Sequence, residues 1–188
     1  MSTTTSIPAS TLRERQAPLK TRYESDPESA RLTITVQSAT EGSDPMRVKI
    51  AQASALAGAA PVSWEVGAHP MAGGTDELAC SGDLLLASLA ACQEITLRMV
   101  AATMGITLDQ VDVTVSGDMD FRGTMGLDPE TPVGFERIRT EISVVANAPE
   151  DRLQRLAERA ERYCVVASTL RQSPELTTTI QTATTAAP

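Results

Sequence analysis

Residues 81–105 read SGDLLLASLAACQEITLRMVAATMG, and most of them are apolar or small. Leu, Ala and Met favour helices. Ser81 can cap a helix, and Asp83 falls in the first turn, where the helix dipole stabilises an anion. Gly105 is a common stop signal, so the stretch predicts a helix that ends near Met104. Its apolar side chains face nearly every direction, so we expect the helix to be buried on most sides.

A second helix is expected from Pro149 to about Arg171, because proline is permitted at the first helical position. Its apolar residues recur at helical spacing. They are Leu153, Leu156, Ala157, Ala160, Cys164, Ala167 and Leu170. Each predicted helix therefore carries one cysteine, Cys92 or Cys164, on its apolar stripe.

The remaining apolar residues alternate with polar ones, which is the pattern of half-buried strands. The predicted strands cover residues 31–36, 47–50, 62–66, 111–115, 138–145 and 175–180. Strands and helices do not alternate regularly along the chain, so the fold class is α+β with mainly antiparallel sheets and two long helices. The first helix has more apolar surface than one small sheet can cover. An intimate, intertwined homodimer is the simplest way to bury the rest.

The chain has 188 residues, enough for one domain with a core. Residues 1–16 are rich in Ser and Thr and are expected to form a flexible arm. A single domain is expected over residues 17–181, followed by a flexible tail over residues 182–188. No apolar run is judged long enough to span a bilayer and no secretory signal is evident, so we expect a cytoplasmic protein without a membrane partner.

Charge and cysteine number limit the kinds of partner. The formal net charge is -8 and aromatic residues make up 3% of the chain, so nucleic acid is not an expected partner. Three cysteines cannot form a closed set of disulfides within one chain. They fit either a redox pair with one spare thiol or three inert core residues, and inert core cysteines are the commoner case.

The functional interpretation of Cys92 requires a thiolate. Apolar surroundings raise a thiol pKa, so a guanidinium is expected to reach the sulfur. If the two helices face each other, the small residues around Cys164 allow the close approach that a disulfide requires. Asp83 lies nine residues before Cys92, on the opposite side of the helix, and a capping role suits it better than that of a base.

A metal site is the third interpretation of these residues. It would use His69, Cys80, Cys92 and Cys164, but no spacing typical of zinc ligands supports it. No metal is therefore expected.

Residues 82–97, with Cys92 after two alanines in a leucine-rich helix, resemble the OsmC/Ohr family of osmotically inducible and organic hydroperoxide resistance proteins. The second cysteine of that family lies far downstream in a Cys-Pro-Val-like motif, a place that Cys164-Val-Val holds here. The resemblance covers about residues 30–181. The chain departs from the family at Gly82, where the peroxide-reducing members have a glutamate, and at Val165, where they have a proline.

The resemblance implies an intertwined dimer that reduces organic hydroperoxides. Cys92 would be the peroxidatic cysteine and Cys164 the resolving one, a dithiol would act as reductant, and no cofactor would be needed. The arginine that activates the thiol comes from the N-terminal strands in the family, and Asp83 would support the site. The candidate arginines are Arg22, Arg31 and Arg47, with Arg122 as a fourth. The alternative function is a non-enzymatic dimer that binds a small apolar ligand or a partner.

Overall fold

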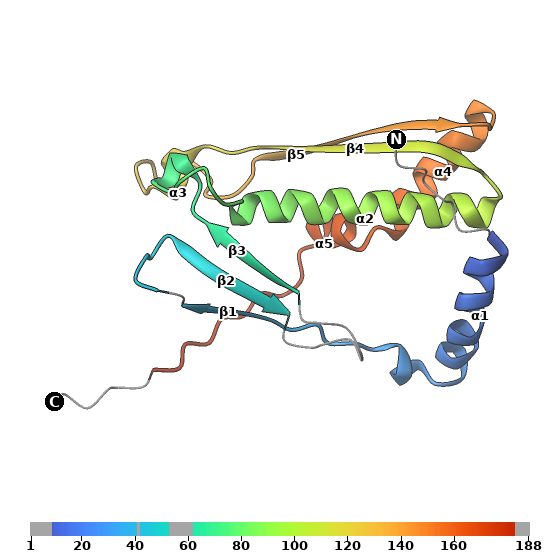
Figure 1. The fold of residues 1–188 in the computed structure, drawn as a ribbon, viewed down its shortest axis with the longest axis horizontal. Coiled ribbons are helices and arrows are strands. Elements are labelled where there is room, and N and C mark those ends of the chain that lie inside the picture. Colours follow the sequence, from blue (N-terminus) through green and yellow to red (C-terminus); the bar gives the residue numbers. More distant parts are fainter. Residues whose placement is uncertain (1–8, 41, 53–61, 183–188) are drawn as a thin grey trace.

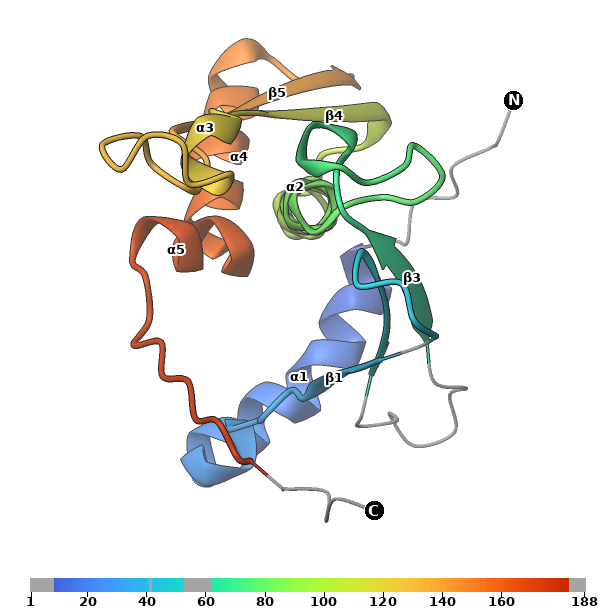
Figure 2. The ribbon, with the colours of Figure 1, turned by 90° about the vertical axis from the view of Figure 1, so that its left-hand side faces the viewer.

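The computed structural model describes residues 9–40, 42–52 and 62–182. A long central helix, α2 (Ser81–Met104), lies along a two-stranded antiparallel sheet made of β4 (Leu108–Asp118) and β5 (Arg137–Ala146) (Figure 1). Two further helices, α4 (Glu150–Tyr163) and α5 (Val165–Arg171), pack beside α2 below that sheet (Figure 2). The α+β class with antiparallel sheets is therefore confirmed.

Helix α2 has the predicted bounds, and its two ends show why. Gly105 ends the helix with a left-handed backbone at φ 66°, a conformation that glycine adopts without steric cost. At the other end, the Asp83 carboxylate accepts a hydrogen bond of 2.8 Å from the backbone N–H of Cys80. Cys80, rather than Ser81, is therefore the N-cap residue. Asp83 is the third residue of the helix, the position from which a side chain in a capping box bonds back to the N-cap residue.

The sheet of β4 and β5 positions the apolar side chains that cover α2. The register pairs Val113 with Ile142 and Val115 with Thr140, and it shifts once, near Leu108. Because side chains alternate between faces, one face of each strand turns toward the helices. A short helix, α3 (Phe121–Thr124), lies in the connection between the two strands.

A second antiparallel sheet contains β1 (Val36–Thr40), β2 (Arg47–Gln52) and β3 (Ser63–Gly67), in that order. It projects away from the helices (Figures 1 and 2). The first predicted strand is displaced, because β1 starts at Val36 and pairs Val36 with Gln52. Residues 31–35 pair with no strand in the part of the chain that the structure describes, although Leu32 and Ile34 alternate as strand residues do.

Three other expectations differ from the structure. The second long helix is broken at Cys164, so α4 and α5 are separate helices. Residues 175–180 are extended but pair with no strand among the described residues. The N-terminal helix α1 (Ala9–Ser25) occupies residues 9–16, where a flexible arm was expected; residues 1–8 of that arm, and residues 183–188 of the tail, lie outside the described residues.

Two short 3-10 helices complete the described elements. The first, η1 (Pro27–Ala30), follows α1, and the second, η2 (Pro70–Ala72), lies between β3 and α2. The loop around η2 and the connection around α3 are held together by a stack of His69 on Phe121, with ring centroids 5.0 Å apart.

The buried core lies almost entirely between α2, α4, α5 and the sheet of β4 and β5. One cluster contains Leu97, Ala101, Ile106, Leu156 and Ala160. A second cluster contains Leu89, Cys164 and Ala167, with Cys92, Val115, Ile138 and Val166 packed against it. The cysteines therefore lie in one of the two places where the helices and the sheet meet.

Helix α2 is also long and apolar enough to cross a membrane, judged by length and composition alone. The expectation that no segment reaches this length is therefore wrong. Helix α2 packs against β4, α4 and α5, but of its residues only Leu89, Leu97 and Ala101 are buried in the described structure, so the expectation of a helix buried on most sides is also wrong.

Candidate active site

Cys92 and Cys164 come together where the middle of α2 meets the break between α4 and α5. Cys164 has 0% of its surface exposed, and Cys92 is half-buried. Cys164 belongs to the buried cluster with Leu89 and Ala167, and Cys92 packs against that cluster. The predicted meeting of the two helices at their cysteines is what the structure shows, although neither sulfur is in a disulfide.

The break in the second helix explains how Cys164 is held. Its backbone is extended, at φ -73° and ψ 109°, which ends α4 at Tyr163 and lets α5 start afresh at Val165. Its Sγ accepts a hydrogen bond of 3.5 Å from the backbone N–H of Ala167. The first N–H groups of a helix lack partners within the helix, and the sulfur satisfies one of them. Cys164 is thus both the N-cap of α5 and a member of the thiol pair.

The two sulfurs differ in acidity. Burial raises the pKa of the Cys92 thiol, but the backbone N–H of Val166, the Cys164 thiol and the backbone N–H of Val165 together outweigh burial and leave the pKa below its ordinary value. Burial raises the pKa of Cys164, and the neighbouring Cys92 raises it further. Hydrogen bonds to a charged form favour that form. Of the two, Cys92 is therefore the sulfur that ionises first.

The side chain of Thr96 also interacts with the Cys92 sulfur and lowers its pKa. Thr96 follows Cys92 by four residues on α2, so the two share one face of the helix. The sequence analysis noted this shared face but gave Thr96 no role. The i, i+4 spacing was the signal that could have identified it.

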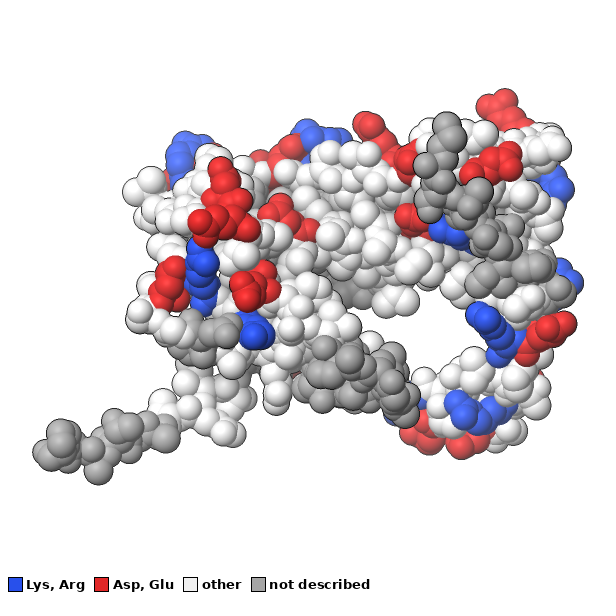
Figure 3. Space-filling view, viewed as in Figure 1, with Lys and Arg blue, Asp and Glu red and all other residues white. Residues whose placement is uncertain are grey.

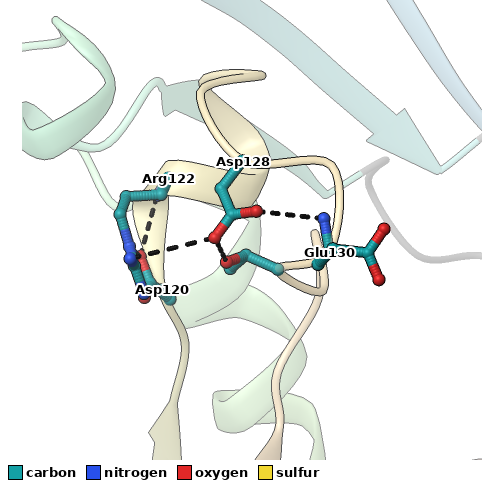
Figure 4. Close-up of polar contacts among 5 residues, drawn as sticks. Asp120, Arg122, Asp128 and Glu130 are labelled. Atoms are coloured by element: carbon teal, nitrogen blue, oxygen red, sulfur yellow. Dashed lines mark hydrogen bonds and ion pairs between the residues drawn. The ribbon is translucent and has the colours of Figure 1, made fainter.

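The four arginines proposed to serve the thiol are engaged elsewhere in the described structure. Arg122, for example, forms one ion pair with Asp120 and another with Asp128, and both lie in the connection around α3 (Figure 4). Arg22 lies over the ring of Tyr23 at 5.3 Å, Arg31 pairs with Glu28, Arg47 pairs with Asp44 and Glu77, and Arg122 pairs with Asp120 and Asp128. Burial has the largest influence on the pKa of Cys92, and it is opposed by the backbone N–H groups of Val166 and Val165 and by the side chains of Cys164 and Thr96.

Asp83 lies at the start of α2, away from the thiol pair. The backbone N–H of Cys80, followed by the Cys80 thiol, lowers the pKa of the Asp83 carboxyl. Its contacts are those of a helix cap. Within the described residues, no three His, Cys, Asp or Glu side chains cluster as metal ligands, so the set of His69, Cys80, Cys92 and Cys164 is not brought together.

A groove of about 690 Å³ runs beside the thiol cluster. Leu89 and Ala167 belong to both the cluster and the groove wall. The groove lies between one face of α2, strand β5, α4 and α5, and most of its lining is aliphatic. Six polar or charged residues also line it: Gln93, Glu136, Arg137, Thr140, Glu161 and Arg171. The Oε1 of Gln93 is buried without a hydrogen-bond partner in the described structure.

The sequence profile of the OsmC-like protein family matches residues 74–179. This is more than half of the chain, and it contains α2, both sulfurs and the break at Cys164. The chain therefore belongs to the OsmC-like family. A search of curated proteins finds no match.

Solved structures share this fold at low sequence identity. An OsmC-like protein from Mycoplasma pneumoniae is 15% identical, with a TM-score of 0.60 over 76% of this chain and 89% of the other. An organic hydroperoxide resistance protein OsmC from Legionella pneumophila is 18% identical, with a TM-score of 0.54 over 75% of this chain and 90% of the other. An OsmC-like protein of unknown function from Vibrio cholerae is 9% identical, with a TM-score of 0.57 over 74% of this chain and 94% of the other.

Proposed function

We propose that this chain reduces organic hydroperoxides, with Cys92 as the peroxidatic cysteine and Cys164 as the resolving cysteine. The observation that carries the proposal is the packing of both cysteines in one apolar cluster, with Cys92, whose pKa is lowered, half-buried and Cys164, whose pKa is raised, fully buried. Similar solved structures include a protein named for organic hydroperoxide resistance.

The reaction follows from the different acidity of the two sulfurs. The Cys92 thiolate attacks the terminal oxygen of the hydroperoxide, the O–O bond breaks, and Cys92 becomes a sulfenic acid. The alkoxide that leaves takes a proton from solvent and becomes an alcohol. The Cys164 thiol then attacks the sulfenic sulfur, water leaves, and a disulfide forms. A dithiol reductant restores both thiols by disulfide exchange and is itself oxidised to a disulfide.

The surroundings of the pair favour an alkyl hydroperoxide. The residues packed around the sulfurs are aliphatic: Leu89, Val115, Ile138, Val166 and Ala167. A highly polar peroxide would lose hydration there without gaining hydrogen bonds. An alkyl group instead gains from burial of apolar surface.

We also infer that the working form is a homodimer. Several large apolar residues of β1–β3 and of the segments before and between these strands are exposed, including Leu32, Ile34, Val36, Val62 and Trp64. In the space-filling view, charged side chains lie mostly around the edges of the molecule, and the middle of the face over α2 is largely uncharged (Figure 3). An uncharged and apolar area of this kind is typical of a surface that another chain covers.

A variant series tests the reaction. Cys92→Ser is expected to abolish consumption of cumene hydroperoxide, because the serine hydroxyl does not ionise at neutral pH. Cys164→Ser is expected to allow one turnover and to leave a sulfenic acid that a dimedone probe traps. Cys80→Ser is the matched control and should retain turnover with a dithiol. Equal consumption by the Cys92→Ser variant and the wild type would contradict the proposal.

The groove supports a second candidate, a non-enzymatic protein that binds a small apolar ligand. Its volume of about 690 Å³ and its largely aliphatic lining suit such a ligand. This candidate predicts that the Cys92→Ser variant binds an apolar fluorescent probe as tightly as the wild type, and that neither thiol oxidises when hydroperoxide is added. Oxidation of the pair at one equivalent of peroxide favours the enzyme.

A further inference from the structure

Three arginines of α4 line a cavity that is separate from the groove beside the thiol pair. They are Arg152, Arg155 and Arg159, and Met104, the last residue of α2, completes the wall of a space of about 320 Å³. Spacings of three and four residues place the arginines on one side of α4. The described residues of the thiol cluster do not line this cavity, so its chemistry is independent of the two sulfurs.

The positive charge around this cavity is only partly neutralised. Arg155 pairs with Asp151, one turn earlier on α4. Arg152 donates a hydrogen bond of 2.5 Å to the backbone carbonyl of Met104, which leaves the charge of its guanidinium in place. Within the described residues, Arg159 has no ion-pair partner. The cavity therefore has three guanidinium groups and one paired carboxylate, on a chain whose formal net charge is -8.

The end of α2 does not use up all three guanidinium groups. The last carbonyls of a helix lack partners within the helix and carry partial negative charge. Arg13 of α1 donates a hydrogen bond of 3.2 Å to the carbonyl of Thr103, and Arg152 donates to that of Met104. Two arginines thus satisfy these two carbonyls. Arg155 and Arg159 make no hydrogen bond to α2 in the described structure, and both are exposed to solvent at the cavity.

We propose that this cavity binds a small oxyanion with two or more negative charges, of the phosphate or diphosphate class, through Arg155 and Arg159 with Arg152 beside them. Such an anion balances the excess of positive charge, and guanidinium groups bind phosphate through two parallel hydrogen bonds. The volume lies at the lower end of ligand pockets, which span about 300–1,000 Å³. A long polyanion such as nucleic acid is disfavoured, because the chain as a whole is acidic.

The test is isothermal titration calorimetry of the full-length protein with pyrophosphate, at pH 7 and constant low ionic strength. We expect saturable binding with one site per chain. Arg159→Gln should raise the dissociation constant about tenfold or more, because it removes a charge-assisted contact to the anion. Arg159→Lys keeps the charge but loses the planar pair of donors, so its dissociation constant should lie between those of the wild type and Arg159→Gln.

Arg162→Gln is the matched control, because it removes the same charge from the same helix. The Arg162 guanidinium lies over the ring of Tyr163 at 5.7 Å and is not part of the cavity wall, so this variant should keep the wild-type dissociation constant. Arg159 is exposed, and circular dichroism should show that its variants remain folded. Equal weakening by Arg159→Gln and Arg162→Gln would reduce the effect to net charge and overturn the proposal, as would a wild type that does not bind pyrophosphate saturably.

Discussion

The two sheets of this protein differ in what they bury. The sheet of β4 and β5 lies against α2 and encloses both buried clusters. The sheet of β1–β3 contributes one buried side chain, Val66, which is 4% exposed. On the same strand, Trp64 is 44% exposed. One half of the chain therefore has a core of its own, and the other half does not.

This difference separates what the single chain buries by itself from what we propose that a second copy covers. The thiol pair lies wholly within the half with a core, so the two sulfurs meet without help from a partner. The sheet of β1–β3 has strand pairing but little packing, and burial of its exposed apolar side chains would stabilise it. Covering that face is the work we assign to the second copy.

The largest effect is expected in the half with the core. Leu156 is 1% exposed and packs with Leu97 and Ala101. Leu156→Ala removes apolar contact and leaves a cavity, so the free energy of unfolding should fall by about 2–5 kcal/mol. Urea denaturation followed by circular dichroism measures it. Leu127→Ala, at a residue 75% exposed, is the matched control and should change little. Equal effects at the two sites would remove the basis of the comparison.

The next largest effect is expected in the sheet of β1–β3, and it should appear in association. Trp64→Ser removes an exposed aromatic side chain from the face that we assign to the dimer. Such a side chain is often an energetic centre of an interface, so the dimer dissociation constant should rise about tenfold or more. Analytical ultracentrifugation over a range of concentrations measures the constant, with Ser63→Ala as control. A wild-type protein that is monomeric at every concentration would contradict the assignment.

A smaller effect is expected at the start of α2. Asp83→Asn removes the charge that caps the helix, and the free energy of unfolding at pH 7 should fall by about 0.5–1 kcal/mol. The backbone N–H of Cys80 lowers the pKa of Asp83 in the folded state, so its charge stabilises the fold above the unfolded pKa and ceases to do so as the pH falls through the folded pKa. The difference between variant and wild type should therefore shrink below about pH 4 and vanish at lower pH.

Urea denaturation at a series of pH values measures this dependence, with Asp76→Asn in the preceding loop as control. A difference that stays constant down to the lowest pH would show that the charge of Asp83 does not act on the helix.

Helix α2 was predictable because its signals are local. A leucine- and alanine-rich run supplies the helix, and Gly105 supplies the stop at φ 66°. The break at Cys164 had no such signal. Val165 and the residues after it continue the helical spacing, and the contact that stabilises the break joins the Cys164 sulfur to the N–H of Ala167. No sequence pattern predicts that a cysteine sulfur will cap a helix in this way.

The other differences between the expected and the observed structure arise where a contact with a distant part of the chain decides what a segment does. Residues 175–180 have a strand pattern, with Leu176 and Ile180 highly exposed, but a strand forms only against another strand. The thiol pair itself was predictable from two cysteines on two apolar helices. The contacts of the candidate arginines were not, because they depend on the fold: Arg47, for example, pairs with Glu77, which lies 30 residues away in sequence.

The pairing of the two sulfurs is tested most directly by the intact mass of the reduced protein after one equivalent of cumene hydroperoxide, followed by peptide mapping without reduction. Cys92 and Cys164 pack in one cluster, so the mass should fall by two hydrogens and the new disulfide should join these two residues. An unchanged mass, or a disulfide that uses Cys80 in place of either one, would contradict the account.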